Sequence, residues 1–224
     1  MECIIETGVQ NLRQKILLMA SQSNAAVTLA MEALAGRDIR LAQKIKEDDH
    51  LIDQMEVSID ELAMNLLTHA PLASDLRFIT AALRITNNLE RIGDEAAKIA
   101  KRARDLAMEP AIDLHLDFLG MARQALAMLN DALDAFATLD SAAARQVILC
   151  DCQLDALYRQ KQAELTRHMI GHPGDIVRCL HWLVVVKSLE RIGDHATNIA
   201  EDVVFLGEAQ DVRHSGLKNP TAPP

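Results

Sequence analysis

The chain has 224 residues and a formal net charge of −9; half of its residues are hydrophobic, but only 3% are aromatic. This acidic balance argues against a broad nucleic-acid-binding surface, because phosphate binding depends on clustered Lys and Arg. The apolar residues are mainly Ala, Leu, Ile and Met, which favour helix packing over sheets. The composition therefore predicts an all-α protein.

Two further classes are disfavoured by the apolar pattern. The longest apolar stretch, 179–186, is far shorter than the roughly 18 to 20 residues that cross a bilayer. The N-terminal sequence MECIIETGVQNLRQ lacks the basic region, apolar core and cleavage site of an export signal. We therefore expect a cytoplasmic protein without a transmembrane segment.

The four cysteines are scattered along the chain. They are expected to be structural thiols rather than disulfide partners or metal ligands.

Gly and Pro residues divide the chain into six long segments in which apolar residues recur at spacings of three and four. In chain order, the helices are expected at about 5–35, 38–68, 72–107, 112–138, 140–170 and 175–207. Asp38 and Asp140 are predicted N-caps at an offset of 102 residues, and Pro71 and Pro173 recur at the same offset. The segments therefore form two matching sets of three.

An internal repeat supports this division. Residues 89–100 read LERIGDEAAKIA, residues 189–200 read LERIGDHATNIA, and nine of the twelve positions are identical. A repeat at a fixed offset indicates duplication of a structural unit. We predict two tandem antiparallel three-helix bundles, at 1–108 and 109–208. Residues 209–224, with three prolines in the last five positions, are expected to be a disordered tail.

Each half also contains two pairs of carboxylates one helical turn apart. On a helical wheel, Glu90 and Asp94 lie about 140° from the centre of the apolar arc, so they project away from the core. Their counterparts are Glu190 and Asp194. The second predicted helix of each half adds a further pair: Asp49 with Asp53, and Asp151 with Asp155. Carboxylates at this spacing repel each other unless a cation compensates.

If the second and third helices of each bundle are antiparallel neighbours, four carboxylates converge in one outer groove. All-oxygen clusters suit hard cations such as ferric iron, Mn²⁺, Mg²⁺ or Ca²⁺. The sequence therefore predicts two metal sites, with ligands Asp49, Asp53, Glu90 and Asp94 in the first and Asp151, Asp155, Glu190 and Asp194 in the second. The alternative is a solvated acidic face that binds nothing, as in a plain helical adaptor.

Neighbouring positions refine this prediction. Gly93 and Gly193, inside predicted helices, indicate close helix contact. His195 occupies the position equivalent to Glu95 of the first repeat, and Asn198 the position equivalent to Lys98. The two sites are therefore expected to differ in metal affinity. His50 and His195 are expected to have surface or packing roles rather than to bind metal.

A rival interpretation is a di-iron carboxylate enzyme. Such enzymes need two Glu-x-x-His motifs that face the interior of a bundle. Only Glu47 to His50 fits that pattern, and the acidic pairs lie outside the apolar arc. The sequence also shows no nucleophile with a matching base, so no enzymatic activity is expected.

The doubled LERIGD phrase, the segment PLASDLRFITAALRITNNLERIGD at 71–94 and the GHPGD turn at 171–175 closely resemble the PhoU family of bacterial phosphate-signalling regulators. The resemblance spans about residues 5–207. The family's E/D-x-x-x-D motifs coincide with the four acidic pairs, so the resemblance implies that these eight residues bind multinuclear clusters of iron, or else of zinc or another divalent cation.

The resemblance also implies a cytoplasmic homodimer that regulates phosphate uptake and represses the phosphate-starvation response. Its implied partners are a phosphate ABC transporter and a sensor histidine kinase at the inner membrane. Our hypothesis from the residues is that metal-bridged acidic grooves rigidify each bundle and present a surface to one of these partners, without covalent chemistry.

Overall fold

The computed structural model describes residues 2–68, 72–114 and 117–213, and all regular secondary structure within these ranges is helical. In chain order the elements are α1 (Glu2–Gly36), α2 (Ile39–Asp48), α3 (His50–Leu67), α4 (Ala73–Ala107), α5 (Phe118–Thr138), α6 (Ser141–Gly171), the short 3₁₀ helix η1 (Pro173–Asp175) and α7 (Ile176–Glu208). The all-α prediction is confirmed.

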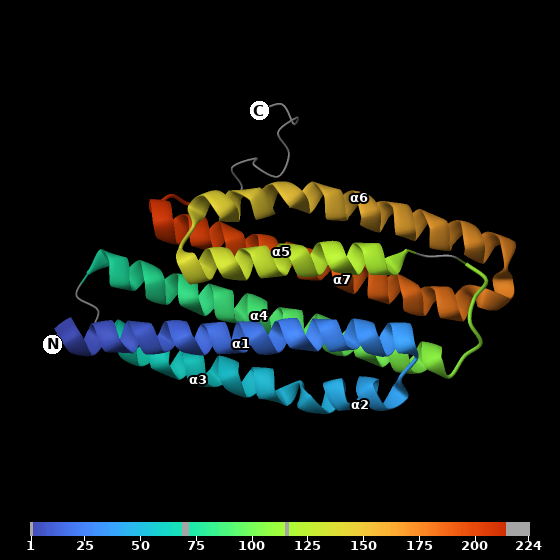
Figure 1. Cartoon of the computed structure of the whole chain (residues 1–224), viewed down its shortest axis with the longest axis horizontal. Coiled ribbons are helices and arrows are strands. Elements are labelled where there is room, and N and C mark those ends of the chain that lie inside the picture. The colour runs from blue at the N-terminus through green and yellow to red at the C-terminus, as the bar shows by residue number, and fades with distance from the viewer. Residues whose placement is uncertain (1, 69–71, 115–116, 214–224) are drawn as a thin grey trace.

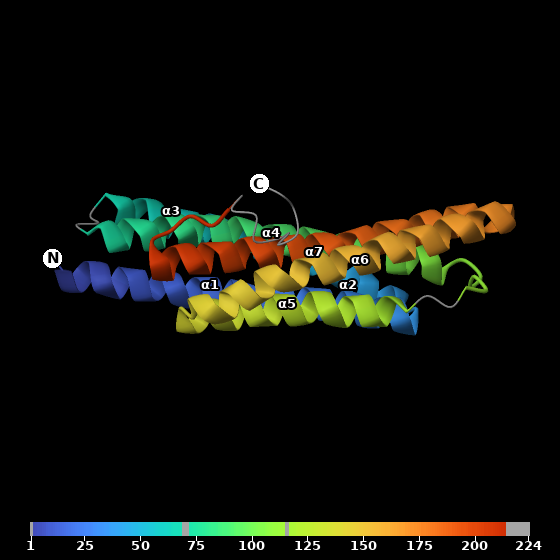
Figure 2. The same ribbon diagram turned by 90° about the horizontal axis from the view of Figure 1, so that it is seen from above.

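The helices form two bundles that lie side by side (Figure 1). Helices α1 to α4 make the first bundle, in which α2 and α3 together take the place of one helix, and α5 to α7 make the second. The long helices α4 and α7 pack against each other, and α1 contacts α5, so the two bundles share a long interface (Figure 2). The predicted architecture of two tandem three-helix bundles is confirmed.

Both predicted N-caps are present with matching geometry. The Asp38 carboxylate accepts hydrogen bonds from the amides of Arg40 and Leu41 at 2.9 and 3.0 Å. The Asp140 carboxylate does the same for Ala142 and Ala143 at the same two distances. In each repeat the side chain thus satisfies amides that the first helical turn leaves without a partner. The repeat therefore extends from sequence to local hydrogen bonding.

Two predicted helices differ from those observed. The segment 38–68 is interrupted at Asp49, where His50 Nδ1 lies 2.6 Å from the Glu47 carbonyl oxygen and Ile52 N bonds to Asp49 O at 3.0 Å in a tighter turn. The helix predicted at 112–138 corresponds to α5, which begins at Phe118. Leu114 precedes Phe118 by four residues, a helical spacing, but Ile112 and Leu114 pack from the connecting segment against the core.

The core of each bundle is built from the apolar arcs that the wheel identified. Leu89, Ile92, Leu189 and Ile192 have no exposed surface. Gly93 and Gly193 lie where the neighbouring helix approaches: a Cβ at Gly93 would lie 2.8 Å from Ile52 Cδ1, and one at Gly193 would lie 2.2 Å from Leu154 Cδ2. The expected close helix contact at both glycines is confirmed.

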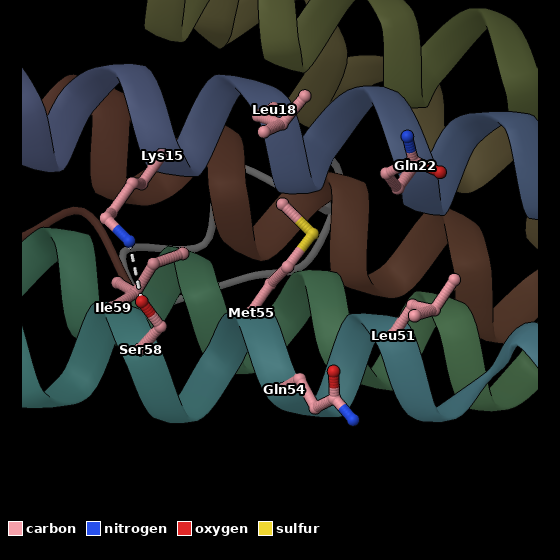
Figure 3. Close-up of a pocket in the computed structure, with 8 residues that line it drawn as sticks. All are labelled: Lys15, Leu18, Gln22, Leu51, Gln54, Met55, Ser58 and Ile59. Carbon is pink, nitrogen blue, oxygen red and sulfur yellow. Dashed lines mark hydrogen bonds between the residues drawn. The ribbon is translucent and has the colours of Figure 1, made fainter.

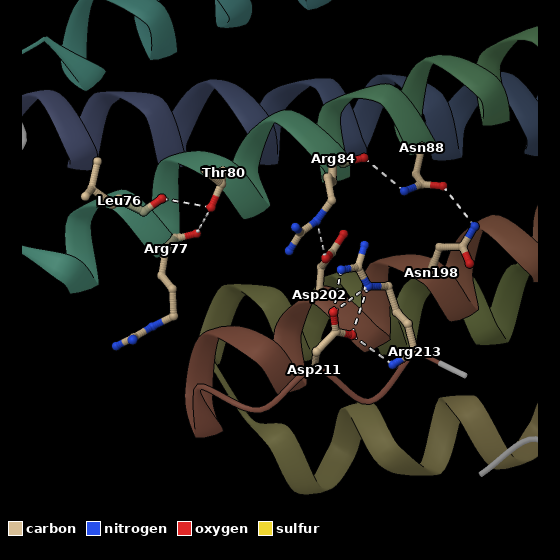
Figure 4. A network of polar contacts seen from close by, with 9 residues as sticks. All are labelled: Leu76, Arg77, Thr80, Arg84, Asn88, Asn198, Asp202, Asp211 and Arg213. Atoms are coloured by element: carbon tan, nitrogen blue, oxygen red, sulfur yellow. Dashed lines mark hydrogen bonds and ion pairs between the residues drawn. The ribbon is translucent and has the colours of Figure 1, made fainter. Parts of the chain in front are cut away.

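A polar network joins the bundles along α4 and α7 (Figure 4). Arg84 Nε donates to Asp202 Oδ1 at 2.7 Å, and the Asn88 side-chain oxygen accepts from Asn198 at 3.2 Å. Burial raises the pKa of Asp202 to about 6, despite the opposing charge and hydrogen bond of Arg84. The interface between the repeats therefore contains a buried titratable group.

Residues 209–213 leave the helix after Glu208 and turn back over the bundle. Val212 is buried, and Arg213 pairs with Asp211 next to Asp202 (Figure 4). The remainder of the predicted disordered tail, 214–224, and Pro71, at the predicted break before the third helix, lie outside the described residues. Among the helices that the structure describes, none is both long enough and apolar enough to span a bilayer.

Candidate functional site

The structure brings the four predicted ligands of the first repeat into one neighbourhood. Asp49 lies at the α2–α3 break, Asp53 on α3, and Glu90 and Asp94 on α4, which packs along α3. Burial raises the pKa of Asp49, and the charges of Asp53 and Asp94 raise it further. The break between α2 and α3 thus places a carboxylate beside those of both neighbouring helices.

Glu90 is the most constrained of these carboxylates. Its side chain is only 15% exposed, and burial raises its pKa, as do the charges of Asp94, Glu56 and Asp53. Its Oε2 is buried and has no hydrogen bond, although Arg91 Nε lies 3.2 Å away. A buried carboxylate oxygen without a hydrogen bond is costly unless another ligand compensates it.

The structure adds one carboxylate that sequence reasoning missed. Glu56 lies on the same flank of α3, and burial and the charge of Asp60 raise its pKa against a hydrogen bond from Asn87. We name as the first acidic groove the set Asp49, Asp53, Glu56, Glu90 and Asp94. The spacing of Glu56 three residues after Asp53 was the available sequence signal, but Glu56 has no carboxylate counterpart in the second repeat.

The second repeat holds its carboxylates differently. We name as the second acidic groove the set Asp151, Asp155, Glu190 and Asp194, on α6 and α7. Lys187 Nζ donates to both carboxylate oxygens of Glu190, at 2.7 and 2.6 Å, and lies 5.1 Å from the centre of the Tyr158 ring. Burial opposes the charged form of Lys187, but the hydrogen bonds and charge of Glu190 raise its pKa.

Asp151 also has a partner from the protein itself. It is 7% exposed and accepts a hydrogen bond from the buried Thr197 hydroxyl at 3.2 Å. The first repeat has Ala97 at the position of Thr197, Asn87 at that of Lys187 and Glu56 at that of Tyr158. The second groove therefore carries a lysine and a hydroxyl donor that the first groove lacks, whereas in the first groove Arg91 lies 3.2 Å from Glu90 and 3.4 Å from Asp94.

The side chains around the grooves explain the remaining differences between the repeats. Glu95 is buried and pairs with Lys98 at 3.0 Å and with Arg191, from the other repeat, at 3.3 Å. His195, at the position matching Glu95, bonds to Asn88 at 2.9 Å. These groups stabilise the interface between the bundles, which confirms the packing role expected for His195. The His50 ring contacts backbone at the α2–α3 break.

Within the described ranges, no three His, Cys, Asp or Glu side chains are already arranged around one point as metal ligands. The donors of the first acidic groove are nonetheless all carboxylate oxygens, which hard cations prefer, and the buried Glu90 Oε2 has no hydrogen bond, although Arg91 Nε lies 3.2 Å from it. Rotation of side chains on α3 and α4 would be needed to complete a coordination shell. In the second groove Lys187 donates to both carboxylate oxygens of Glu190, so a cation there would have to displace two hydrogen bonds.

These features define a class of two-repeat helical-bundle proteins. A model of the PhoU domain matches residues 16–103 and again 118–203. The chain is 41% identical to a phosphate-specific transport system accessory protein PhoU homolog of Pseudomonas putida, over 96% of this chain and 84% of that protein. It is 40% identical to the homolog of the same name in Pseudomonas aeruginosa, over 93% and 87%.

Solved structures agree with this assignment. The crystal structure of PhoU from Pseudomonas aeruginosa superposes with a TM-score of 0.89 at 38% identity, over 92% of this chain and 99% of that one. The phosphate transport system regulatory protein PhoU from Streptococcus pneumoniae superposes with a TM-score of 0.82 at 29% identity, over 93% and 99%. The chain therefore belongs to the PhoU family. This is a family of transport accessory and regulatory proteins rather than enzymes, so the di-iron enzyme alternative is rejected.

Proposed function

We propose that this protein regulates phosphate uptake and represses the phosphate-starvation response from the cytoplasm, between a phosphate ABC transporter and a sensor histidine kinase. The observation that carries this proposal is the match to PhoU proteins, which includes both repeats and nearly the whole chain. Relatives named as accessory proteins of phosphate-specific transport support the transporter as one partner. We also propose that the protein acts as a homodimer. The proposals of a kinase partner and of a homodimer are supported by the family resemblance alone.

A bacterial strain that lacks its own PhoU and carries a reporter of the phosphate-starvation response tests this role. Expression of the chain should return the reporter to its repressed level at high phosphate and leave induction at low phosphate intact. A reporter that stays fully induced at high phosphate, despite normal levels of folded protein, would contradict the proposal.

We also propose that the acidic grooves bind a multinuclear metal cluster, with iron as the first candidate and zinc or another divalent cation as alternatives. In the first groove the ligands would be Asp49, Asp53, Glu90 and Asp94, with Glu56 beside them. A bound cation would supply positive charge to carboxylates whose pKa values are raised by burial and, to a lesser degree, by their mutual repulsion. The protein's own contribution is to hold ligands from α3 and α4 opposite each other, so that binding would couple these helices.

Elemental analysis tests the metal proposal. The variant Glu90→Gln with Asp94→Asn should lose most of the iron or other metal that copurifies with the wild-type protein, and circular dichroism should show the same helicity. The matched control is Asp131→Asn with Asp134→Asn, which removes an exposed acidic pair outside both grooves and should retain the metal. Equal metal content in the groove variant, or none in the wild type after growth with added iron, would contradict the proposal.

A further inference from the structure

The first two turns of α7 expose a stripe of aliphatic side chains. Ile176, Val177, Leu180 and Val184 are 40%, 61%, 50% and 39% exposed. On a helical wheel they fall within one arc of about 100°, while Val185, on the other side of the helix, is fully buried. Grouped exposed aliphatic side chains are a feature of interaction surfaces. We name these four residues the α7 stripe.

The first repeat shows that the bundle architecture does not require this stripe. At the repeat offset of 100 residues, the matching positions on α4 hold Leu76, Arg77, Thr80 and Arg84. Three of the four are polar, and Arg84 uses its charge to pair with Asp202 at 2.7 Å. The same place in the fold therefore tolerates polar side chains, so packing within the bundle does not explain the α7 stripe.

The α7 stripe lies at a protruding end of the molecule. Helices α6 and α7 are joined by η1, and their joined end extends beyond the α1–α2 turn in both views (Figure 1, Figure 2). We name residues 159–187 the α6–α7 end. Ile170, close to the turn, is 77% exposed. A protruding apolar end can enter a flat lipid surface, which needs no complementary shape.

The exposed leucines of the first repeat have a different setting. Leu18 and Leu51 are 57% and 44% exposed, but they line a recessed groove of about 400 Å³ between α1 and α3 (Figure 3). Lys15 Nζ crosses this groove and donates to Ser58 Oγ at 2.6 Å. A recessed pair of leucines is out of reach of a flat surface, so it provides a control for the α7 stripe.

The charge of the α6–α7 end is basic, although the whole chain is acidic. Residues 159–187 contain five Lys or Arg and two acidic residues, in a chain whose formal net charge is −9. Both carboxylates have partners within this end: Glu164 lies 3.0 Å from Lys161, and Asp175 lies 2.7 Å from His168. The next acidic residue after Asp175 is Glu190, beyond the α7 stripe. This end therefore suits an anionic surface.

Cations also lie next to the α7 stripe in space. Lys187 follows Val184 by three residues on the same side of α7, and its side chain is 47% exposed although it pairs with Glu190. From the neighbouring bundle, Arg102 Nη1 on α4 lies 2.9 Å from His181 Nδ1. Aliphatic and cationic side chains thus occur together on this part of the surface.

We propose that the α6–α7 end binds directly to the surface of an anionic lipid bilayer. The α7 stripe would enter the boundary between headgroups and acyl chains, and the exposed Arg167, with Lys187 and Arg102, would contact lipid phosphates. Nucleic acid is a disfavoured occupant, because it offers no apolar phase to the stripe. This inference goes beyond the proposed function, in which partner proteins bring the chain to the membrane.

Vesicle flotation tests this proposal on the full-length protein. Vesicles contain either phosphatidylcholine alone or equal parts of phosphatidylcholine and phosphatidylglycerol, without added divalent cations. The wild type should float with the anionic vesicles, more weakly at higher salt, and should not float with phosphatidylcholine alone. The variant Val177→Asn with Leu180→Asn should partition about tenfold more weakly, and Arg167→Glu about fivefold more weakly.

The matched control is Leu18→Asn with Leu51→Asn, which changes two leucines of similar exposure in the recessed groove. It should float like the wild type. Circular dichroism should show the same helicity in all variants. Equal loss of flotation in the control would contradict the assignment to the α7 stripe.

Other outcomes would overturn the proposal. The wild type would then fail to float with anionic vesicles, or the stripe variant would float equally well. If sedimentation shows that the wild type is a dimer and the stripe variant a monomer, the stripe is an interface between copies of this chain. Binding of a labelled Leu–Glu helical peptide in place of vesicles would assign the stripe to an acidic protein partner. The vesicles contain neither transporter nor kinase, so the result is independent of the proposed function.

Discussion

The two repeats have the same core but different grooves. Leu89 and Leu189 are both fully buried, Asp38 and Asp140 cap equivalent helices with the same bond lengths, and Gly93 and Gly193 both admit a neighbouring helix. In the first groove Arg91 lies 3.2 Å from Glu90 and 3.4 Å from Asp94, whereas in the second Lys187 pairs with Glu190 and Arg191 pairs with Glu95 instead. The residues that build the bundle are thus equivalent in the two repeats, while the side chains that pair with the groove carboxylates differ.

The largest expected effect tests the equivalence of the two cores. Leu89→Ala and Leu189→Ala should each lower the free energy of unfolding by about 3 to 4 kcal/mol, because each removes a fully buried side chain from a packed core. Urea denaturation followed by circular dichroism measures both. A difference between them of more than about 2 kcal/mol would show that the cores are not energetically equivalent.

The interface between the repeats should respond to pH through Asp202. Its folded pKa of about 6 lies above the ordinary aspartate value of 3.8, so the folded state binds the proton more tightly and this group's contribution to stability falls as pH rises from about 4 to 6. The total change is up to about 3 kcal/mol. Asp202→Asn retains an acceptor for Arg84 and should remove this part of the pH dependence. The free energy of unfolding is measured between pH 4 and 7 for both proteins. The same pH dependence in wild type and variant would contradict this assignment.

The helix caps give a smaller, symmetric effect. Asp38→Ala and Asp140→Ala should each destabilise the protein by about 1 kcal/mol, because each leaves two amides of a first helical turn without their acceptor. Thermal or urea unfolding measures the loss. Asp38→Asn and Asp140→Asn serve as controls that should retain most of the cap. A loss confined to one of the two alanine variants would break the symmetry of the repeats.

Sequence patterns predicted the fold well because the helices are long and their apolar arcs are regular. The break at Asp49 was missed because the residues around it keep helical periodicity, while the interruption depends on a His50 contact with the backbone. The start of α5 was wrong because Ile112 and Leu114 continue an apolar pattern outside a helix. The first error arises from a local side-chain contact with the backbone, and the second from tertiary packing of the connecting segment.

The candidate sites were predictable as acidic pairs, but their inequality was only partly so. The wheel found all eight predicted carboxylates, and His195 and Asn198 pointed to a difference between the halves. It did not find Lys187 or Thr197, which neutralise or hydrogen-bond carboxylates in the second groove. A position-by-position comparison of the repeats would have revealed both, since Asn87 and Ala97 occupy the matching positions. Their contacts required the structure.

We propose that the exchange of Asn87 in the first repeat for Lys187 in the second weakens cation binding in the second groove relative to the first. Calorimetric titration with Mn²⁺, as a probe for hard cations, tests it on wild type, Asn87→Lys and Lys187→Asn. We predict that Asn87→Lys weakens the tighter binding step about fivefold or more, and that Lys187→Asn strengthens the weaker step by a similar factor, equivalent to about 1 kcal/mol. Identical titrations for all three folded proteins would contradict the claim.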